Sequence, residues 1–371
     1  MGLSALASFP RPQLAAQPPQ PPDPLAVRSA MIPRINDRTY RGLIGAWGDD
    51  DSLRFAAAGV TTTLGAPIDQ TTVFELGEIG NLFTSAVLAS LVVRGELSLD
   101  DPVQKFVPGV ARLTRRESRP MTLGDLAFHR SGLTASAGSG AWRTSARSDA
   151  QLIASLRTDA EPGARYVWSQ RGISLLEIAL ERHLHMPIAD AVRRRVLAPL
   201  GVEDITTGTG AQRGASTGRR ATGHTQRGAP LEATAASATR WRGSASALAL
   251  FTTASSDTVR GPLARAFALM MRTRSPGPDA SLPVALGWRV LRLNGRDIYW
   301  HDALDAPGFS SYVAIDPGMR RSVAVLSNTA RPVDAIAGQL LLGRVPVIAP
   351  APPSGPTPRQ PPTRSRRRGR R

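Results

Sequence analysis

Strand-like segments occur near both ends of this chain, and helical segments lie between them. Residues 40–60 contain the short apolar stretches GLIGAW and RFAAAGV, which are separated by the turn GDDDS. From Leu286 onward, the runs GWRVLRL, DIYWH, SSYVAID and SVAVLSN are rich in the β-branched and aromatic residues typical of strands. This order predicts an α/β protein of the α+β type: an antiparallel sheet built from both chain ends, with flanking helices and an inserted helical subdomain.

The middle of the chain carries the helix signals. Residues 78–94 form a long segment with an apolar face, and Gly95 is a typical helix stop. Residues 122–129 start at Thr122, a suitable N-cap, and Asp125 stands where a capping box needs an acceptor. Four further stretches are predicted to be helical: residues 150–156, 171–198, 244–273 and 332–343.

Both ends of the chain differ from the middle in composition. Of the 31 prolines, eight lie in residues 1–33 and another eight in residues 345–371. Segments rich in proline and poor in aromatic residues bury too little surface to offset the loss of chain entropy, so we expect both to be disordered. The folded domain is therefore predicted to span residues 34–344.

The chain is strongly basic, with a formal net charge of +17, and its basic residues are almost all arginine. The tail from Arg359 holds seven arginines and no acidic residue. Such a cluster can attract nucleic acid or an anionic membrane surface as a weak partner through non-specific charge interactions. A solvated tail encoded by an arginine-rich bacterial genome is the simpler alternative. The sequence leaves the oligomeric state open.

Targeting signals are weak in this sequence. The N-terminus lacks the basic region and the sustained apolar core of a secretory signal, and no run approaches the ~18 apolar residues of a membrane-spanning helix. We therefore expect a soluble protein of the cytoplasm. The chain contains no cysteine, which excludes disulfides, thiolate catalysis and cysteine-bound metals.

Six short blocks follow one another along the folded part of the chain. They are FELGEIGNLFTS, GELSLDDPV, TLGDLAFHRSGL, PGARYVWSQRGISLL, APLGVEDITTG and HDALDAPGFSSYVAIDP. In this order they resemble the serine β-lactamase and penicillin-binding-protein superfamily, and especially its branch of class C β-lactamases and related esterases. The resemblance extends from about Thr39 to Gly343. Any single block is a weak signal, but six in order imply the β-lactamase-like fold.

The resemblance also shows which catalytic residues are replaced. In that superfamily a Ser at the start of a helix is the nucleophile, and a Lys three residues later activates it. Here Glu78 stands at the Ser position and Asn81 at the Lys position. In the second block Trp168 replaces a Tyr, Ser169 is kept, and Gln170 replaces an Asn.

The third block is altered less. His301, Gly308 and Ser311 remain, whereas Ala303 occupies the place of a family glycine. A shifted alignment does not restore the mechanism, because the only lysine, Lys105, lies in DPVQKFVPG and no serine has a lysine three residues later. The acyl-enzyme reaction of the family is therefore expected to be absent from this chain.

Glu78 has two interpretations. A carboxylate in the first turn of a helix is stabilised by the helix dipole by about 0.3–1 kcal/mol, so Glu78 could simply stabilise a helix in an inactive site. Alternatively, Glu78 and His301 form an acid–base pair for proton transfer, water activation or a cyclisation. The second interpretation requires both side chains to reach one substrate.

Other chemistry-bearing residues in these blocks are expected to be structural. Ser85 lies on the helix expected to be buried, while Ser131 and Ser311 are expected to shape turns and pocket walls. A substitute nucleophile among these serines is the less favoured alternative. His129 is interpreted as a packing and hydrogen-bonding residue.

The sequence therefore predicts a pseudoenzyme that binds a small acyl or peptide-like ligand in the old active-site cleft. The alternative is an enzyme with changed chemistry, a hydrolase or a biosynthetic cyclase or isomerase, that uses Glu78 and His301. The residues expected to line the cleft are Asn81, Trp168, Ser169, Gln170, Ala303, Gly308 and Ser311. No cofactor motif is found, and His183 and His185 face different sides of a helix, so neither a cofactor nor a metal is expected.

Overall fold

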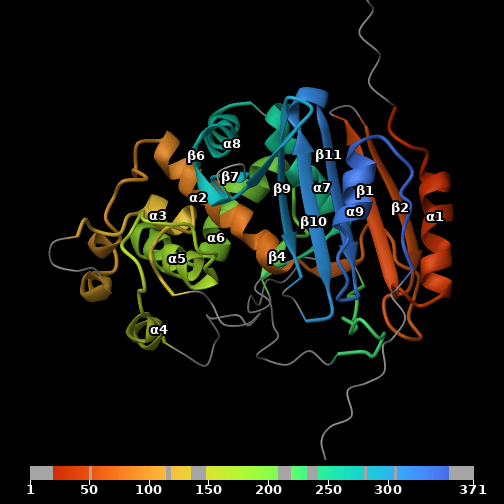
Figure 1. Ribbon diagram of the computed structural model, residues 1–371, viewed down its shortest axis with the longest axis horizontal. Helices are drawn as coiled ribbons and strands as arrows, with labels where there is room; N and C mark the ends of the chain where they lie inside the picture. The colour runs from red at the N-terminus through yellow and green to blue at the C-terminus, as the bar shows by residue number, and fades with distance from the viewer. Residues whose placement is uncertain are drawn as a thin grey trace, which may run out of the picture.

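Both ends of the chain contribute strands to one antiparallel sheet in the computed structural model (Figure 1). The strand order is β2-β1-β11-β10-β9-β8-β7-β6. These strands are β1 (Gly42–Asp49), β2 (Leu53–Gly59), β6 (Arg274–Asp279), β7 (Leu282–Ala285), β8 (Arg289–Leu293), β9 (Arg296–Ala303), β10 (Ser310–Asp316) and β11 (Arg321–Ser327). The structure describes residues 20–49, 52–113, 118–134, 148–207, 219–231, 241–258, 260–279, 282–304 and 307–350.

A second, smaller sheet lies beside the helical part of the molecule, in the order β3-β5-β4. Its strands are β3 (Val73–Glu75), β4 (Thr206–Thr207) and β5 (Trp241–Ser244). The helices are α1 (Pro24–Asn36), α2 (Gly80–Val93), α3 (Leu123–Ala127), α4 (Asp149–Ser155), α5 (Gln170–Leu184), α6 (Ile188–Val192), α7 (Ala245–Thr253), α8 (Pro262–Arg272) and α9 (Asp334–Leu341).

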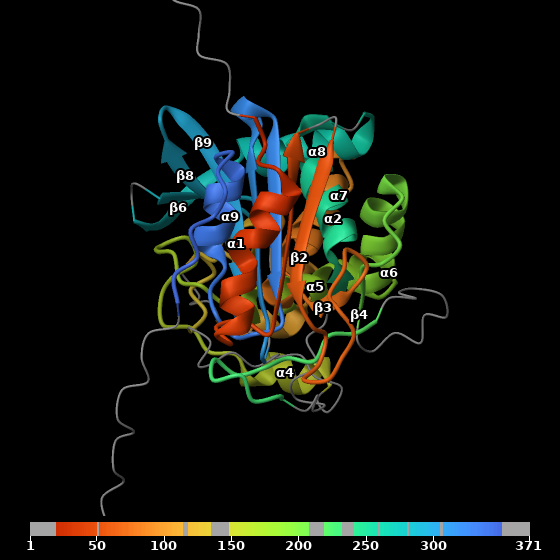
Figure 2. The same cartoon turned by 90° about the vertical axis from the view of Figure 1, so that its right-hand side faces the viewer.

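Helices cover both faces of the large sheet. Figure 2 shows α1 and α9 in front of the sheet and α2, α7 and α8 behind it. The sequence of α2, GNLFTSAVLASLVV, is apolar nearly all round, and all but its last two residues are buried. A helix of this kind is stable only inside a core. Helix α2 therefore forms the centre of the molecule, and its N-terminal end is held in a fixed place.

Several predicted helices form, but with interruptions. Thr122 and Asp125 make the complete capping box that starts α3. The expected helix over 171–198 is broken at His185, which adopts a left-handed conformation and is followed by Pro187. The expected helix over 244–273 is broken at Gly261, where φ is +83°, so α7 and α8 are separate helices.

The predicted limits of the folded domain were too narrow at both ends. Residues 24–33, expected to be disordered, belong to α1, which Asp23 caps and whose Met31 is fully buried against the sheet. At the other end Ile348 is buried, and its carbonyl accepts a hydrogen bond from Arg34 Nε at 2.8 Å. Proline content was misleading here because proline is favoured in the first turn of a helix. The rest of both segments lies outside the described residues.

Strands β6 and β7 were not predicted, because RSPGPD has the composition of a loop. Strand β6 is nevertheless paired with β7 at the edge of the sheet, and it contains Pro276 and Pro278. An edge strand is the position where missing backbone N–H groups are tolerated.

The corrected N-terminal boundary can be tested by mutating α1. Replacing the fully buried Met31 with Ala should lower the free energy of unfolding by about 2–5 kcal/mol, because it leaves a cavity between α1 and the sheet. The matched control is Leu25→Ala on the same helix, where the side chain is 71% exposed and the change should stay within about 0.5 kcal/mol. Urea denaturation measures both. Equal, small effects would show that α1 does not contribute to the core.

Candidate active site

Glu78 lies at the entrance to the buried helix. A 3₁₀ turn over Gly77–Ile79 links β3 to α2, and Gly77 has a φ of +53°. Gly80 begins α2 against Trp241, and a Cβ on Gly80 would lie 1.9 Å from Trp241 Cδ1. Only glycine therefore allows this close approach. The turn holds Glu78 where the sequence placed it, although in a 3₁₀ turn and not in the α-helix itself.

Trp168 contacts Glu78 directly. Its indole Nε1 donates a hydrogen bond to Glu78 Oε1 at 3.2 Å. The indole ring lies between two imidazoles: its centroid is 4.0 Å from that of His129 and 5.7 Å from that of His301. The two candidate catalytic residues, Glu78 and His301, are thus gathered in one cluster, with the indole in contact with both.

A pair of amides joins α2 to α5 beside this cluster. Asn81 Nδ2 donates to Gln170 Oε1 at 3.3 Å, and Gln170 Nε2 donates back to Asn81 Oδ1 at 3.4 Å. Ser169 is the N-cap of α5, and its hydroxyl accepts the N–H of Gly172 at 3.1 Å. Three of the predicted cleft residues therefore have hydrogen-bond partners within the protein, and the half-buried Gln170 amide keeps donor and acceptor capacity to spare.

His129 is the packing and hydrogen-bonding residue predicted from the sequence. It is buried, and its Nδ1 lies 3.2 Å from the backbone N–H of Ser169. Since that N–H donates, Nδ1 is the unprotonated nitrogen of the ring. Burial is the main cause that lowers the pKa of His129 to about 3, and the neighbouring His301 and Arg289 contribute to the same shift.

His301, on β9, is only 1% exposed. Its Nδ1 is 2.9 Å from the backbone carbonyl oxygen of Asp302. Because a carbonyl only accepts, this nitrogen carries the proton and donates a hydrogen bond to the carbonyl. Burial lowers the pKa of His301 to about 3, with Arg289 as the second cause. A general acid or base works best with a pKa near the operating pH, so this imidazole is poorly suited to proton transfer near neutrality.

Arg289 was not identified from the sequence, yet it organises the site. Its guanidinium carbon lies 5.1 Å from the Trp168 ring centroid and 4.8 Å from that of Trp300, and it forms an ion pair with Asp302. Trp300 in turn stacks on Tyr312 at an interplanar angle of 10°. Cation–π contacts of this kind stabilise by about 0.5–2 kcal/mol. No motif marks an arginine on a strand as part of such a stack, so only the three-dimensional contacts reveal it.

Three of the predicted cleft residues are packing residues instead. Ala303 and Ser311 are buried opposite each other on β9 and β10, and the Ser311 hydroxyl donates to the Leu76 carbonyl at 3.0 Å. Gly308 has a φ of +81°, and a Cβ there would lie 2.5 Å from the backbone of Gly223. The Ser311 bond holds the residue that precedes the turn carrying Glu78.

The predicted structural serines are also buried. Ser85 is completely buried on α2, and Gly287 lies against it, so a Cβ at Gly287 would come within 2.7 Å of Ser85 Oγ. The hydroxyl of Ser131 accepts the N–H of Leu133 at 3.4 Å. In the ranges that the structure describes, no group of three or more His, Cys, Asp or Glu side chains is arranged to hold a metal ion, and no helix is long and apolar enough to cross a membrane.

The sequence of this chain matches one family model and parts of several known proteins. The family model described as Beta-lactamase matches residues 28–343. The D-alanyl-D-alanine-carboxypeptidase/endopeptidase AmpH of Escherichia coli (strain K12) is 28% identical over 141 residues, which are 36% of this chain and 36% of that protein. Esterase EstB of Burkholderia gladioli is 30% identical over 156 residues, which are 38% of this chain and 40% of that protein. The matches thus cover well under half of either relative.

Comparison with solved structures covers more of the chain. The D-alanine carboxypeptidase AmpC from Burkholderia cenocepacia has a TM-score of 0.70 and 22% identity, covering 86% of this chain and 97% of that chain. A class C beta-lactamase has a TM-score of 0.72 and 17% identity, and the match covers 86% of this chain and 94% of that chain. At these identities the likeness shows the fold alone, and it confirms the fold predicted from the sequence.

The two buried imidazoles predict how stability depends on pH. In the unfolded chain His129 and His301 take up protons near the ordinary pKa of 6.5, whereas in the folded protein they stay neutral until about pH 3. Protonation therefore favours the unfolded chain, and stability is lost as the pH falls below 6.5. Each histidine should lower the free energy of unfolding by about 2 kcal/mol between pH 7 and pH 5.

Urea denaturation of the wild type and of His301→Gln over this pH range tests the prediction. The variant should lose about half of the pH dependence that the two imidazoles cause, because it lacks one of the two titrating groups. An unchanged slope in His301→Gln would contradict the assignment of a neutral, buried His301.

Proposed function

This chain belongs to the beta-lactamase family, and on that premise we propose that it is a binding protein that has lost the acyl-enzyme chemistry of its relatives. The observation that carries the proposal is the Trp168 contact: the residue at the nucleophile position, Glu78, accepts a hydrogen bond from the indole at 3.2 Å. A fold does not by itself imply a reaction, so the residues present decide.

Within the part of the chain that the structure describes, the serines of the family blocks are not placed as activated nucleophiles. The reaction of the family needs a hydroxyl with a base close enough to take its proton, and no serine in this sequence has a lysine three residues later. The serines at Ser85, Ser131 and Ser311 are buried. Their positions support the absence of a substitute nucleophile.

The alternative, acid–base catalysis by Glu78 and His301, has less support. His301 is buried, its Nδ1 donates to a backbone carbonyl, and its pKa of about 3 leaves it neutral and weakly basic. Trp168 lies against both residues. A substrate would have to displace the indole from its contacts with Glu78, His129 and Arg289 before it could meet both groups.

The proposed ligand site is the outer side of the same cluster. Glu78, Trp168 and Gln170 are half-buried, so each keeps part of its surface in contact with solvent. They offer a carboxylate, an aromatic edge and an amide side by side, which suits a small acyl or peptide-like ligand with N–H groups. The relative AmpH is a D-alanyl-D-alanine-carboxypeptidase/endopeptidase and the structural neighbour AmpC is a D-alanine carboxypeptidase, so D-alanyl-D-alanine peptides are the first probe.

The absence of acylation is testable by intact-protein mass spectrometry. After exposure to a penicillin, a fluorophosphonate and an activated ester, the protein should carry no stoichiometric adduct, because no hydroxyl is activated. An acylatable serine hydrolase treated in parallel controls for reagent quality, and circular dichroism checks that the protein is folded. A stoichiometric adduct that maps to one residue would overturn the proposal and identify a substitute nucleophile.

Ligand binding is testable by calorimetric titration with N-acetyl-D-alanyl-D-alanine. We expect saturable binding that Gln170→Ala weakens by about tenfold, since the amide then no longer hydrogen-bonds the probe. Gln70→Ala, an exposed glutamine before β3, is the matched control and should bind like the wild type. If neither variant changes the affinity, the peptide binds outside the cluster around Trp168. If the wild type does not bind the peptide, D-alanyl-D-alanine peptides are excluded as ligands.

A further inference from the structure

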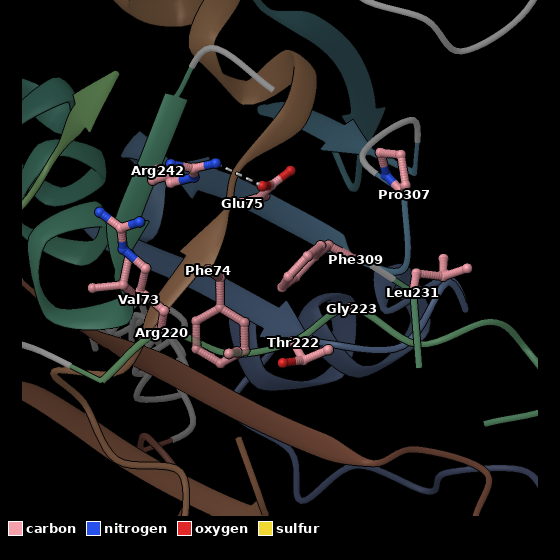
Figure 3. Close-up of a pocket in the computed structure, with 11 residues that line it drawn as sticks. Val73, Phe74, Glu75, Arg220, Thr222, Gly223, Leu231, Arg242, Pro307 and Phe309 are labelled. Atoms are coloured by element: carbon pink, nitrogen blue, oxygen red, sulfur yellow. Dashed lines mark hydrogen bonds and ion pairs between the residues drawn. The ribbon is translucent and has the colours of Figure 1, made fainter. Parts of the chain in front are cut away.

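A separate pocket lies beside the small sheet. It has a volume of about 210 Å³ and is bordered by β3, by residues 220–223 and by residues 307–309, with Leu231 and Arg242 completing its wall (Figure 3). None of its lining residues belongs to the cluster around Trp168 and His301. The volume is below the ~300–1,000 Å³ of pockets that hold drug-sized ligands, so its occupant must be small.

Aromatic rings form the inner part of the pocket. Phe74 and Phe309 are almost completely buried and meet edge to face, with centroids 6.5 Å apart and an interplanar angle of 85°. Both rings point toward the centre of the pocket in Figure 3. Val73 and Leu231 add aliphatic surface. This surface is suited to a planar or branched apolar group.

The rim of the pocket is charged. Arg242 Nη2 pairs with Glu75 Oε1 at 3.1 Å, and both side chains are largely buried. Arg220 is exposed and forms no ion pair with any residue in the described ranges. Figure 3 shows the Arg220 and Arg242 guanidinium groups on the same side of the pocket. Among the described lining residues, two guanidinium groups and one carboxylate give one positive charge in excess.

The backbone around the pocket offers few other donors. The N–H of Ala221 donates to the Val73 carbonyl at 2.9 Å, and the N–H of Leu231 donates to the Gly223 carbonyl at 2.8 Å. The guanidinium groups are therefore the main hydrogen-bond donors on the rim. A guanidinium presents paired N–H groups that match the two oxygens of a carboxylate.

We propose that this pocket binds a small monocarboxylate with an aromatic or branched apolar body. The apolar body contacts Phe74 and Phe309, and the carboxylate pairs with Arg220 and the outer edge of Arg242. One negative charge balances the excess positive charge of the rim. The proposal concerns a different set of residues from the cleft around Trp168, so it stands independently of the function proposed above.

Benzoate and its uncharged analogue benzamide are suitable probes, titrated into the full-length protein by isothermal calorimetry or protein-observed NMR. Benzoate should bind saturably, and benzamide at least about tenfold more weakly, because it lacks the charge that the guanidinium groups recognise. Arg220→Gln should weaken benzoate by about tenfold or more and leave benzamide unchanged.

Arg219→Gln is the matched control. Arg219 is the preceding residue, carries the same charge, and pairs with Asp69 outside the pocket, so its loss should leave benzoate binding within about twofold. Equal losses in Arg219→Gln and Arg220→Gln would show general charge attraction and overturn the proposal. Equal binding of benzoate and benzamide would also overturn it.

A second variant tests the apolar part. Leu231→Trp places a large ring at the half-buried edge of the pocket and should abolish binding of both probes, while Arg220 remains. Glu78→Gln, in the other site, should leave benzoate binding unchanged. Benzoate binding that survives Leu231→Trp, or no saturable benzoate binding by the folded wild type, would refute the site.

Discussion

The pairing of β1 with β11 is the contact on which the rest of the molecule depends. These strands are nearly three hundred residues apart in the chain, yet they pair antiparallel from Leu43 opposite Ser327 to Asp49 opposite Arg321. The pairing joins the two chain ends into one sheet. Helix α2 is buried behind this sheet, and Ser311 on β10 bonds to the Leu76 carbonyl just before α2 begins. The position of Glu78 therefore follows from a contact made between the ends of the chain.

The framework around Glu78 is held by packing contacts. The buried helix, the tight turn at Gly77 and the close approach at Gly308 are features of packing, and they do not depend on which residue stands at position 78. The polar groups near them form hydrogen bonds within the protein. The Trp168 indole bonds to the Glu78 carboxylate, and the amides of Asn81 and Gln170 bond to each other. The imidazole of His301 bonds to a backbone carbonyl. A polar network that is satisfied in this way gives the molecule a stable arrangement without a substrate.

Much of this could be predicted from the sequence. The strands near both ends and the capping box at Thr122 have strong local signals, and the order of the six blocks indicated the β-lactamase-like fold. Helix α1 and strand β6 could not be predicted, because proline is common in three different places: loops, the first turn of a helix and the edge strand of a sheet. Proline content alone does not distinguish among them. Arg289 was missed because its role comes from two rings that lie on either side of it in space, Trp168 and Trp300. Local patterns do not encode such neighbours.

The prolines of β6 have a consequence for assembly. An exposed sheet edge invites a strand from another molecule to pair with it, which leads to polymerisation. At the β6 edge, Pro276 and Pro278 remove two of the donors that an incoming strand would need. At the opposite edge the Arg28 side chain already donates to the Ala57 carbonyl of β2. Both margins of the sheet therefore carry a feature that opposes strand pairing between neighbouring molecules.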